Sequence, residues 1–327
     1  MSTQFVIARE STYGGSLVSQ STRGVEAMSD GLNARLRRVP RTGLRAGAGL
    51  ASAPYRMISD GGEGTVEAAL VSNGLQPLLS AFFGTSAVTT PGGATLARLH
   101  TFTDVNGPAG ESIYMQKVVE QEDGTDGGIF TFKGCVSTGL TFTQGVGDGD
   151  QTYAKVSANI DAKQVLTNVS KATATYRTVG DVFTYETCTV TLGGDVPCAN
   201  DFTLTLDKNL DVSKRCLDTA EPRHAPSKAG FAGVTGQFTV QHAGNDLYDL
   251  WAAGTPVDLV IDWTSTVTIE STTAYQLTIT IPEVTLDGDT PMWNIGTSGT
   301  QTVKLIGSDN LTDEPVTVEL VTTDTAL

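Results

Sequence analysis

The sequence predicts a mainly β protein, an antiparallel β-sandwich or barrel with a short helix. Only 17% of its 327 residues are charged, and glycine makes up about 11% (36 of 327). From residue 100 onward the chain is crowded with threonine, valine, serine and glycine, which favour strands and tight turns. Many short runs also alternate apolar and polar residues, the two-residue period of a half-buried strand.

The first 70 residues combine expected strands with a long irregular segment. A strand is expected at residues 4–10. The segment from Ser11 to Pro54 is rich in glycine, serine and arginine and has little apolar periodicity. We therefore expect a long basic loop over residues 11–54, and a loop of this length in a compact domain is usually functional or disordered. Residues 54–70 have strand character on both sides of a glycine-rich turn.

A short helix is expected within residues 74–84. Its apolar residues share one helical face: Leu75, Leu78, Leu79, Phe82 and Phe83. Pro77 falls in the first turn, where a missing N–H costs little, and Gly84 is a helix stop signal.

Strands dominate the rest of the chain. A glycine-rich turn at residues 123–128 predicts a hairpin between the first two of them. The expected strands are residues 111–122, 129–134, 136–145, 152–161, 172–178, 182–192, 201–210, 236–244, 257–270, 274–286, 300–308 and the first part of 314–327, which ends in a polar tail.

An internal repeat predicts that the fold is duplicated in tandem. Residues 64–81 align without a gap on residues 236–253, and both windows read strand, turn, short helix and glycine. The identical pairs are Gly64/Gly236, Asn73/Asn245, Leu75/Leu247, Leu78/Leu250 and Ala81/Ala253. We expect a tube-like β domain at residues 1–198 and a second at 199–327, the second with a shorter loop. A single large β domain is the alternative.

Charge is distributed unevenly. The net charge is -15, yet residues 1–56 carry eight arginines against three acids, or +5, which leaves 13 basic and 33 acidic groups, or −20, for the remainder. A basic segment on an acidic body can hold neighbouring copies of one protein head to tail. The alternative is a solvated basic loop.

Several short motifs occur in an order that resembles a known family. They are the turn with Glu10, Tyr13 and Gly14, the helix at residues 75–84, the histidine-containing run 96–103, the run 132–142 and the stretch 281–289. In this order they resemble the major tail tube proteins of siphovirus-type, long-tailed bacteriophages. The resemblance covers most of the chain and implies a sandwich with one helix, assembled as rings of six tube units that stack into a hollow tail.

The resemblance implies a structural virion protein that self-assembles into the tail tube through which the genome passes. Its main partner would be itself: a ring of three chains with pseudo-six-fold symmetry is favoured if both halves are tube units, and a hexamer is the alternative. Tape-measure, baseplate and tail terminator proteins would be further partners. DNA would cross the lumen without specific binding. The expected location is the virion tail, after assembly in the bacterial host cytoplasm.

Two groups of residues are candidates for these contacts. Arginines of the basic loop can bind carboxylates of the next ring bidentately: Arg35, Arg37, Arg38 and Arg41. Carboxylates of the predicted hairpin can line the lumen and repel the DNA backbone: Glu120, Glu122, Asp123 and Asp126. The alternative for the second group is a solvated acidic turn.

Catalytic and metal-binding patterns are not found in the sequence. The three histidines, His100, His224 and His242, are scattered. The four cysteines, Cys135, Cys188, Cys198 and Cys216, lack zinc-binding spacing and are expected to be small buried hydrophobes without disulfides. Walker, nucleophile-elbow and dinucleotide-binding motifs are also missing. We therefore expect no enzyme activity, cofactor or metal. No apolar run approaches the roughly 20 residues that span a bilayer, so no membrane association is expected.

Two other functions compete with the tail tube. One is a different binding module, either another phage virion protein or an Ig-like adhesin. The other is a β-sandwich hydrolase with scattered catalytic carboxylates. The long basic segment favours the tube, because a ring that stacks needs an axial contact and an adhesin does not.

Overall fold

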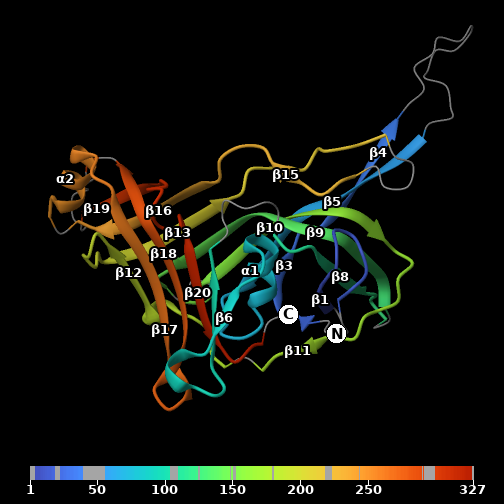
Figure 1. Ribbon diagram of the computed structural model, residues 1–327, viewed down its shortest axis with the longest axis horizontal. Helices are drawn as coiled ribbons and strands as arrows, with labels where there is room; N and C mark the ends of the chain where they lie inside the picture. Colours follow the sequence, from blue (N-terminus) through green and yellow to red (C-terminus); the bar gives the residue numbers. More distant parts are fainter. Residues whose placement is uncertain are drawn as a thin grey trace, which may run out of the picture.

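Antiparallel strand pairing organises the chain, and the predicted mainly β fold is confirmed (Figure 1). The structure, a computed structural model, describes residues 4–18, 23–39, 56–103, 110–123, 126–147, 149, 152–178, 180–217, 223–242, 244–288, 290 and 299–325. Within these residues neither helix has the length and apolar character needed to cross a membrane.

The first half of the chain supplies one group of strands. They are β1 (Gln4–Arg9), β2 (Arg23–Gly24), β3 (Ala27–Asp30), β4 (Asn33–Val39), β5 (Arg56–Ala69), β8 (Ile113–Glu120), β9 (Asp126–Gly145) and β10 (Lys155–Leu166). They pair in the order β2–β1–β8–β9–β10–β5. On the edge of β5 that does not face β10, β4 pairs with the first part of the strand and β3 pairs with the part that follows.

A second group pairs around β18. Its strands are β6 (Ala87–Thr89), β7 (Arg98–Phe102), β12 (Cys188–Leu192), β13 (Ala199–Asp207), β16 (Gly233–Gln241), β17 (Val257–Glu270), β18 (Thr273–Gly288), β19 (Thr300–Gly307) and β20 (Thr317–Thr322). One branch runs β18–β20–β7–β6 and another β18–β17–β12. The short strands β11 (Thr175–Tyr176), β14 (Leu210–Asp211) and β15 (Ser227–Lys228) complete the set.

Two long strands join the groups. β9 pairs with β10 along one edge, while its other edge holds β8 and then β13. β18 pairs with β17 on one edge and holds β20 and then β19 on the other. Successive pairing in the order β9–β13–β16–β19–β18 connects the two long strands. In Figure 1, β9 and β10 run from one group of strands toward the other, and α1 lies between the two groups.

Both predicted helices are present, α1 (Gln76–Phe83) and α2 (Asp246–Ala253). α1 starts with Pro77 near its first position and ends at Gly84, as its sequence predicts. All eight of its residues are buried, however, so α1 has no exposed face opposite the predicted apolar one. α2 has no fully buried residue and covers the core with one side only.

The expected loop at residues 11–54 contains three strands, β2, β3 and β4, where no strand was expected. Their sequences lack apolar alternation because most of β3 and β4 is exposed. The expected turn within residues 54–70 is instead one continuous strand, β5. Gly61 has φ 80°, and a side-chain carbon at Gly64 would collide with the Gly31 carbonyl, so these glycines let neighbouring backbone approach β5 closely rather than forming a turn.

Three later expectations also differ. Residues 129–134 and 136–145 form one strand, β9, because its partners continue across Gly134, which takes φ 63°. Only two residues of 172–178 pair as a strand, and within residues 182–192 a short 3-10 turn at Tyr185–Thr187 precedes β12. The expected polar tail is partly buried where the structure describes it: Thr322 and Asp324 are at most 1% exposed, whereas Thr323 and Thr325 are exposed.

Strands from both predicted domains share one sheet network and one hydrophobic core. β13 pairs with β9, and β20 pairs with β7. The core cluster includes α1 residues and Trp263 of β17. The division at residue 198 stays a prediction. α1 and α2 do each follow a long strand, and their first residues are 170 positions apart (246 − 76).

A buried polar cluster around Asp324 fastens the residues after β20 to distant parts of the chain. The Asp324 carboxylate accepts the Gly74 N–H at 2.6 Å and faces the Arg177 Nε at 3.3 Å. Arg23, from β2, approaches the same carboxylate at 3.9 Å and donates to the Thr325 carbonyl at 2.9 Å.

The same cluster reaches two neighbouring elements. The His100 ring on β7 bonds the Asp324 carbonyl oxygen at 2.9 Å. Asn73 accepts the Thr322 hydroxyl at 2.5 Å and donates to the Thr178 carbonyl at 2.7 Å. Residues from five separate parts of the sequence are therefore held at one buried point.

A second carboxylate, Glu270, lies at the turn of the β17–β18 hairpin. Glu270 accepts the N–H groups of Thr95, Leu96 and Ala97 at 2.7, 2.7 and 2.9 Å, and the Thr95 hydroxyl at 2.8 Å. These backbone hydrogen bonds, that of Ala97 foremost, lower the pKa of Glu270 from 4.5 to about 2. The ionised carboxylate thus holds residues 95–97 against the hairpin.

We predict that Asp324→Ala lowers the free energy of unfolding by about 3 kcal/mol, because Arg23 stays buried without its carboxylate and the Gly74 N–H loses its acceptor. Urea unfolding measures the change. Asp313→Ala removes an exposed carboxylate and is the matched control, with an expected cost below about 0.5 kcal/mol. Equal costs for the two variants would contradict the role given to the cluster.

The depressed pKa of Glu270 predicts acid sensitivity of the hairpin contact. Because the folded-state pKa lies below the unfolded one, the contribution is complete above pH 4.5 and is lost as the pH falls toward about 2. The protection of the amides at residues 95–97, taken as the exchange rate relative to the intrinsic rate at each pH, is expected to fall across that range. In Glu270→Gln this protection is expected to be lower already at neutral pH and to lose the pH dependence; an unchanged protection profile would refute the assignment.

Candidate functional site: the assembly surfaces

The outer ends of β4 and β5 form a two-stranded projection, which we call the basic arm and define as residues 36–39 and 56–59 (Figure 1). In its register Arg37 lies opposite Ile58, and Arg38 lies opposite Met57. Residues opposite each other share a face of the hairpin, so each face carries an arginine beside an apolar residue.

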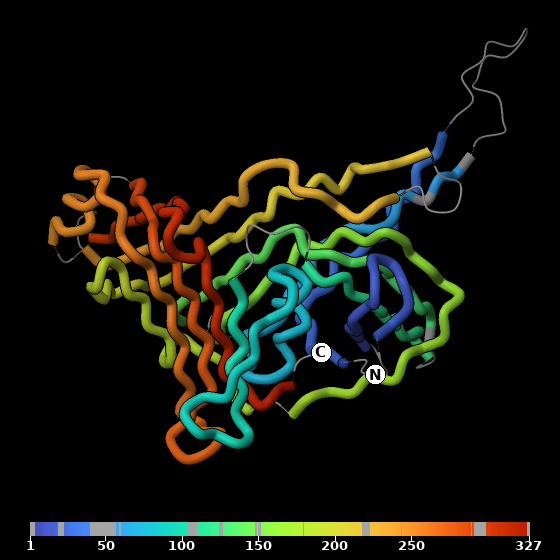
Figure 2. Tube along the Cα trace, in the orientation of Figure 1, coloured from blue at the N-terminus to red at the C-terminus, as the bar shows by residue number. Residues whose placement is uncertain are grey.

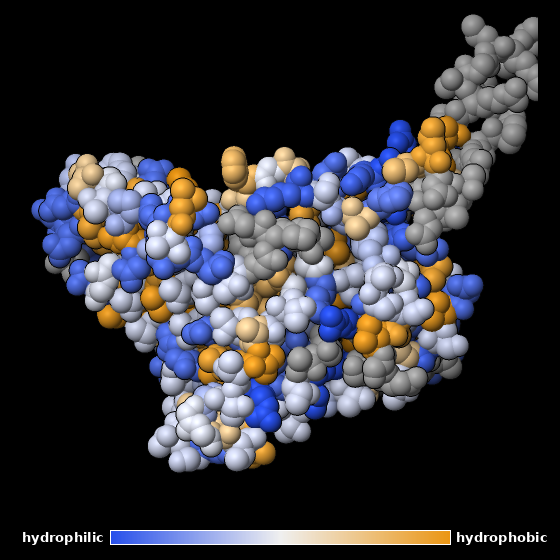
Figure 3. All heavy atoms as spheres, viewed as in Figure 1, coloured by the Kyte–Doolittle hydropathy of each residue, from blue (hydrophilic) through white to orange (hydrophobic). Residues whose placement is uncertain are grey.

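The basic arm exposes apolar side chains on both faces. Leu36 is 62% exposed, Val39 41%, Met57 49% and Ile58 43%. Figure 3 shows this hydrophobic surface at the end of the described part of the projection. An isolated two-stranded hairpin is marginally stable, and clustered exposed apolar residues mark interaction sites. The basic arm therefore has the properties of a segment that binds another surface.

The base of the basic arm is fixed by buried charge. Arg35 pairs with Glu63 at 2.7 Å and with Asp161 of β10 at 3.2 Å. The same Asp161 carboxylate binds Arg223, and both side chains are 5% exposed. Burial is the main effect on Asp161 and raises its pKa, while hydrogen bonding and charge from Arg223 oppose that shift.

Arg223 belongs to a long excursion, residues 208–232, that leaves β13 and returns to β16. Figure 2 shows it running in yellow from the second group of strands to the base of the basic arm. There Arg215 pairs with Asp60 of β5 at 2.5 Å. At its start, the Lys208 Nζ lies 5.2 Å from the centre of the Phe82 ring. The excursion thus joins the core at α1 to the basic arm.

The predicted inter-ring arginines fall into three groups. Arg37 and Arg38 lie on the exposed basic arm. Arg35 lies at its base, where its guanidinium is engaged within the chain. Arg41 lies outside the described residues.

The predicted lumen carboxylates gather in one place, the end of the β8–β9 hairpin. Glu120 and Asp126 are opposite each other in the register. Glu122 and Asp123 follow Glu120 and are exposed. The structure therefore brings the four predicted positions together, as hairpin pairing predicts.

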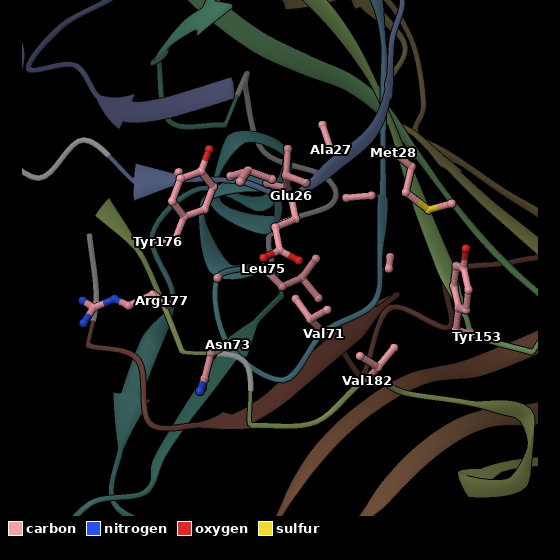
Figure 4. Close-up of a pocket in the computed structure, with 16 residues that line it drawn as sticks. Glu26, Ala27, Met28, Val71, Asn73, Leu75, Tyr153, Tyr176, Arg177 and Val182 are labelled. Carbon is pink, nitrogen blue, oxygen red and sulfur yellow. The ribbon is translucent and has the colours of Figure 1, made fainter. Parts of the chain in front are cut away.

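A pocket of about 350 Å³ lies at the opposite end of β5 from the basic arm (Figure 4). Tyr153 and Tyr176 stand on its sides, and Glu26 also lines it. Its apolar lining comes from Val25, Ala27, Met28, Ala68, Ala69, Val71, Leu75, Leu78 and Val182. Sequence reasoning missed this pocket, because its residues come from five separate stretches that only the fold brings together.

The turn that carries the family resemblance is organised by Glu10. Its buried carboxylate accepts the Gly14 N–H at 2.9 Å, the Ser112 hydroxyl at 2.7 Å and the Gly134 N–H at 3.0 Å. Burial raises the pKa of Glu10, although these hydrogen bonds act in the opposite direction. Gly14 has φ 69°, which favours glycine, and a side-chain carbon there would lie 2.7 Å from the Lys163 side chain.

Comparison with known proteins decides the family. A family model described as phage tail tube protein matches residues 2–319. The chain belongs to this family. A search of curated proteins finds no match. Members are structural proteins of the virion tail, so the basic arm, the acidic hairpin end and the pocket lie on a subunit of the phage tail.

The cysteines of this tail tube protein differ from expectation in their burial. Cys135 is buried, but Cys198 and Cys216 are exposed, because each lies in an irregular connection outside the strands. All four are free thiols. His100 is fully buried, and its ring bonds the Ser86 hydroxyl and the Asp324 carbonyl oxygen.

We predict unequal roles for the two carboxylates at the base of the basic arm. Asp161→Asn is expected to lower the free energy of unfolding by about 3 kcal/mol, because Arg223 stays buried without a counter-charge. Asp60→Asn is the matched control and should cost less than about 1 kcal/mol, since its pair with Arg215 is about a third exposed. Urea unfolding of both variants tests this, and a larger cost for Asp60→Asn would contradict it.

Proposed function

We propose that this tail tube protein self-assembles into closed rings, and that the rings stack into the hollow tube through which the phage genome passes. The observation that carries the proposal is the basic arm, which presents arginine and apolar side chains on a projection from a body with a net negative charge. Such a projection serves a repeated axial contact between copies. Arg37 and Arg38 make this contact, with Arg41 as a further candidate.

Within a ring, sheet edges are the proposed lateral contact. Among the described strands, β6 pairs only with β7 and β12 only with β17, so each leaves an edge with unpaired backbone groups. An edge strand that pairs with a neighbouring subunit removes that exposed edge. Tandem halves with one helix each support a ring of three chains with pseudo-six-fold symmetry, and a ring of six chains is the alternative.

The acidic end of the β8–β9 hairpin is proposed to face the lumen. Its carboxylates, from Glu120 to Asp126, repel the DNA backbone and let it pass without specific binding. At physiological salt this field decays over about 8 Å, so it acts across a narrow gap. Tape-measure, baseplate and tail terminator proteins are the further partners, and assembly takes place in the bacterial host cytoplasm.

The purified chain tests the assembly directly. Negative-stain microscopy and light scattering on concentrated protein should show hollow tubes or six-lobed rings. A chain that remains monomeric and also fails to extend tails begun on its own baseplate would overturn the proposal.

We predict that Arg37→Glu with Arg38→Glu leaves rings intact but prevents their stacking, because the reversed charges face an acidic neighbouring ring. Microscopy would then show single rings in place of tubes. Lys171→Glu with Lys304→Glu changes the net charge equally at exposed sites outside the basic arm and the excursion, and should still form tubes. Tubes of normal length from the arginine variant would contradict the axial role.

A further inference from the structure

We infer that the pocket at the far end of β5 is the acceptor for the basic arm of a second copy of this chain. This inference rests on the proposed stacking and names the surface that receives the axial contact. One strand would then carry the inserting segment at one end and the receiving site at the other.

The position of the two sites on β5 is the first argument. Met57 and Ile58 belong to the basic arm, whereas Ala68 and Ala69 line the pocket. At ~3.3 Å per residue, the eleven steps from Met57 to Ala68 span at most about 36 Å. A segment and its complement at opposite ends of a subunit make a head-to-tail contact, which gives an open filament when the rotation between copies does not close into a ring.

The chemistry of the two surfaces is the second argument. The basic arm offers four aliphatic or thioether side chains, each at least 41% exposed. The pocket, of about 350 Å³, offers aliphatic walls between Tyr153 and Tyr176. Filling it with apolar side chains removes both surfaces from water at once.

Charge complementarity is the third argument. Figure 4 shows the Glu26 side chain among those that line the pocket, and Glu26 is exposed. Its acidic neighbours are already paired, Asp30 with Lys117 at 2.7 Å and Glu67 with Lys155 at 3.6 Å. Arg177, the cation in the lining, faces Asp324. Glu26 is thus placed to meet an arginine that arrives with an apolar hairpin.

Another exposed apolar residue offers a competing occupant. Phe231, in the excursion 208–232, is 92% exposed. It lies next to β16 rather than at an end of β5, and the cation beside it in the sequence is Lys228 rather than an arginine. An arginine can bind the Glu26 carboxylate through two parallel N–H groups, which a lysine cannot do. This favours the basic arm, and the experiment below separates the two.

Cysteine cross-linking in assembled protein tests the contact. In a background with Cys198→Ser and Cys216→Ser, Met28→Cys marks the pocket and Ile58→Cys marks the basic arm. A mixture of the two variants, assembled and treated with a short bismaleimide, should give cross-linked dimers. The matched control replaces Ile58→Cys with Leu311→Cys, at a residue that is 90% exposed elsewhere, and should give none.

Charge reversal tests the same contact without cross-linking. Glu26→Arg should raise the protein concentration needed for tube formation at least about tenfold, because it places like charges together. Adding Arg37→Glu to Glu26→Arg should restore most of that loss, although Arg37→Glu alone is also harmful. Thermal unfolding of each free variant checks that the fold is unchanged.

The outcomes separate this inference from the proposed function. If wild-type chains form tubes while Glu26→Arg stacks normally and no Met28–Ile58 cross-link appears, the pocket is not the acceptor and the stacking function stands. If Phe231→Ser blocks stacking while Ile58→Ser does not, the excursion is the occupant and the inference is wrong. If wild-type chains never assemble, the proposed function itself fails.

Discussion

The buried carboxylate of Asp324 is the constraint on which the rest of the fold depends. An ionised group in this position is costly unless several donors surround it. Here the donors come from β2, from the turn before α1 and from the segment after β11, and each must be in place for the others to be satisfied. The turn at Asn73 and Gly74, which leads into α1, is therefore held by residues that come about 250 positions later in the chain.

Burial of charge recurs at the base of the basic arm, with a different consequence. Asp161 holds one arginine from β4 and another from the excursion, so the start of the projection is rigid. Beyond that point the hairpin exposes apolar side chains on both faces, and among the described strands β4 and β5 pair there only with each other. A fixed base with an exposed end separates the two tasks of the segment, which are to stay anchored to its own subunit and to present a surface to another.

The sequence predicts those parts of the fold in which local pattern and burial agree. Residues 257–270 and 274–286 alternate cleanly, and they form β17 and β18. β4 was missed because a hairpin exposed on both faces needs no alternation, and β5 was divided because its glycines normally signal a turn. Of the candidate site, the acidic hairpin end could be predicted from its turn and the exposed arginines from their charge. The pocket and the roles of Arg35 and Asp324 depend on residues distant in sequence, which pattern alone does not bring together.

β9 has a mechanical consequence for a tail subunit. Its twenty residues are held on one edge by β10 and on the other by β8 and β13 in succession. A force along this strand is shared among many ladder hydrogen bonds in shear, rather than breaking them one after another as peeling from an end would. β9 therefore connects the two groups of strands mechanically. In a subunit under tension or bending, the loops and projections would deform first and the pairing along β9 would break last.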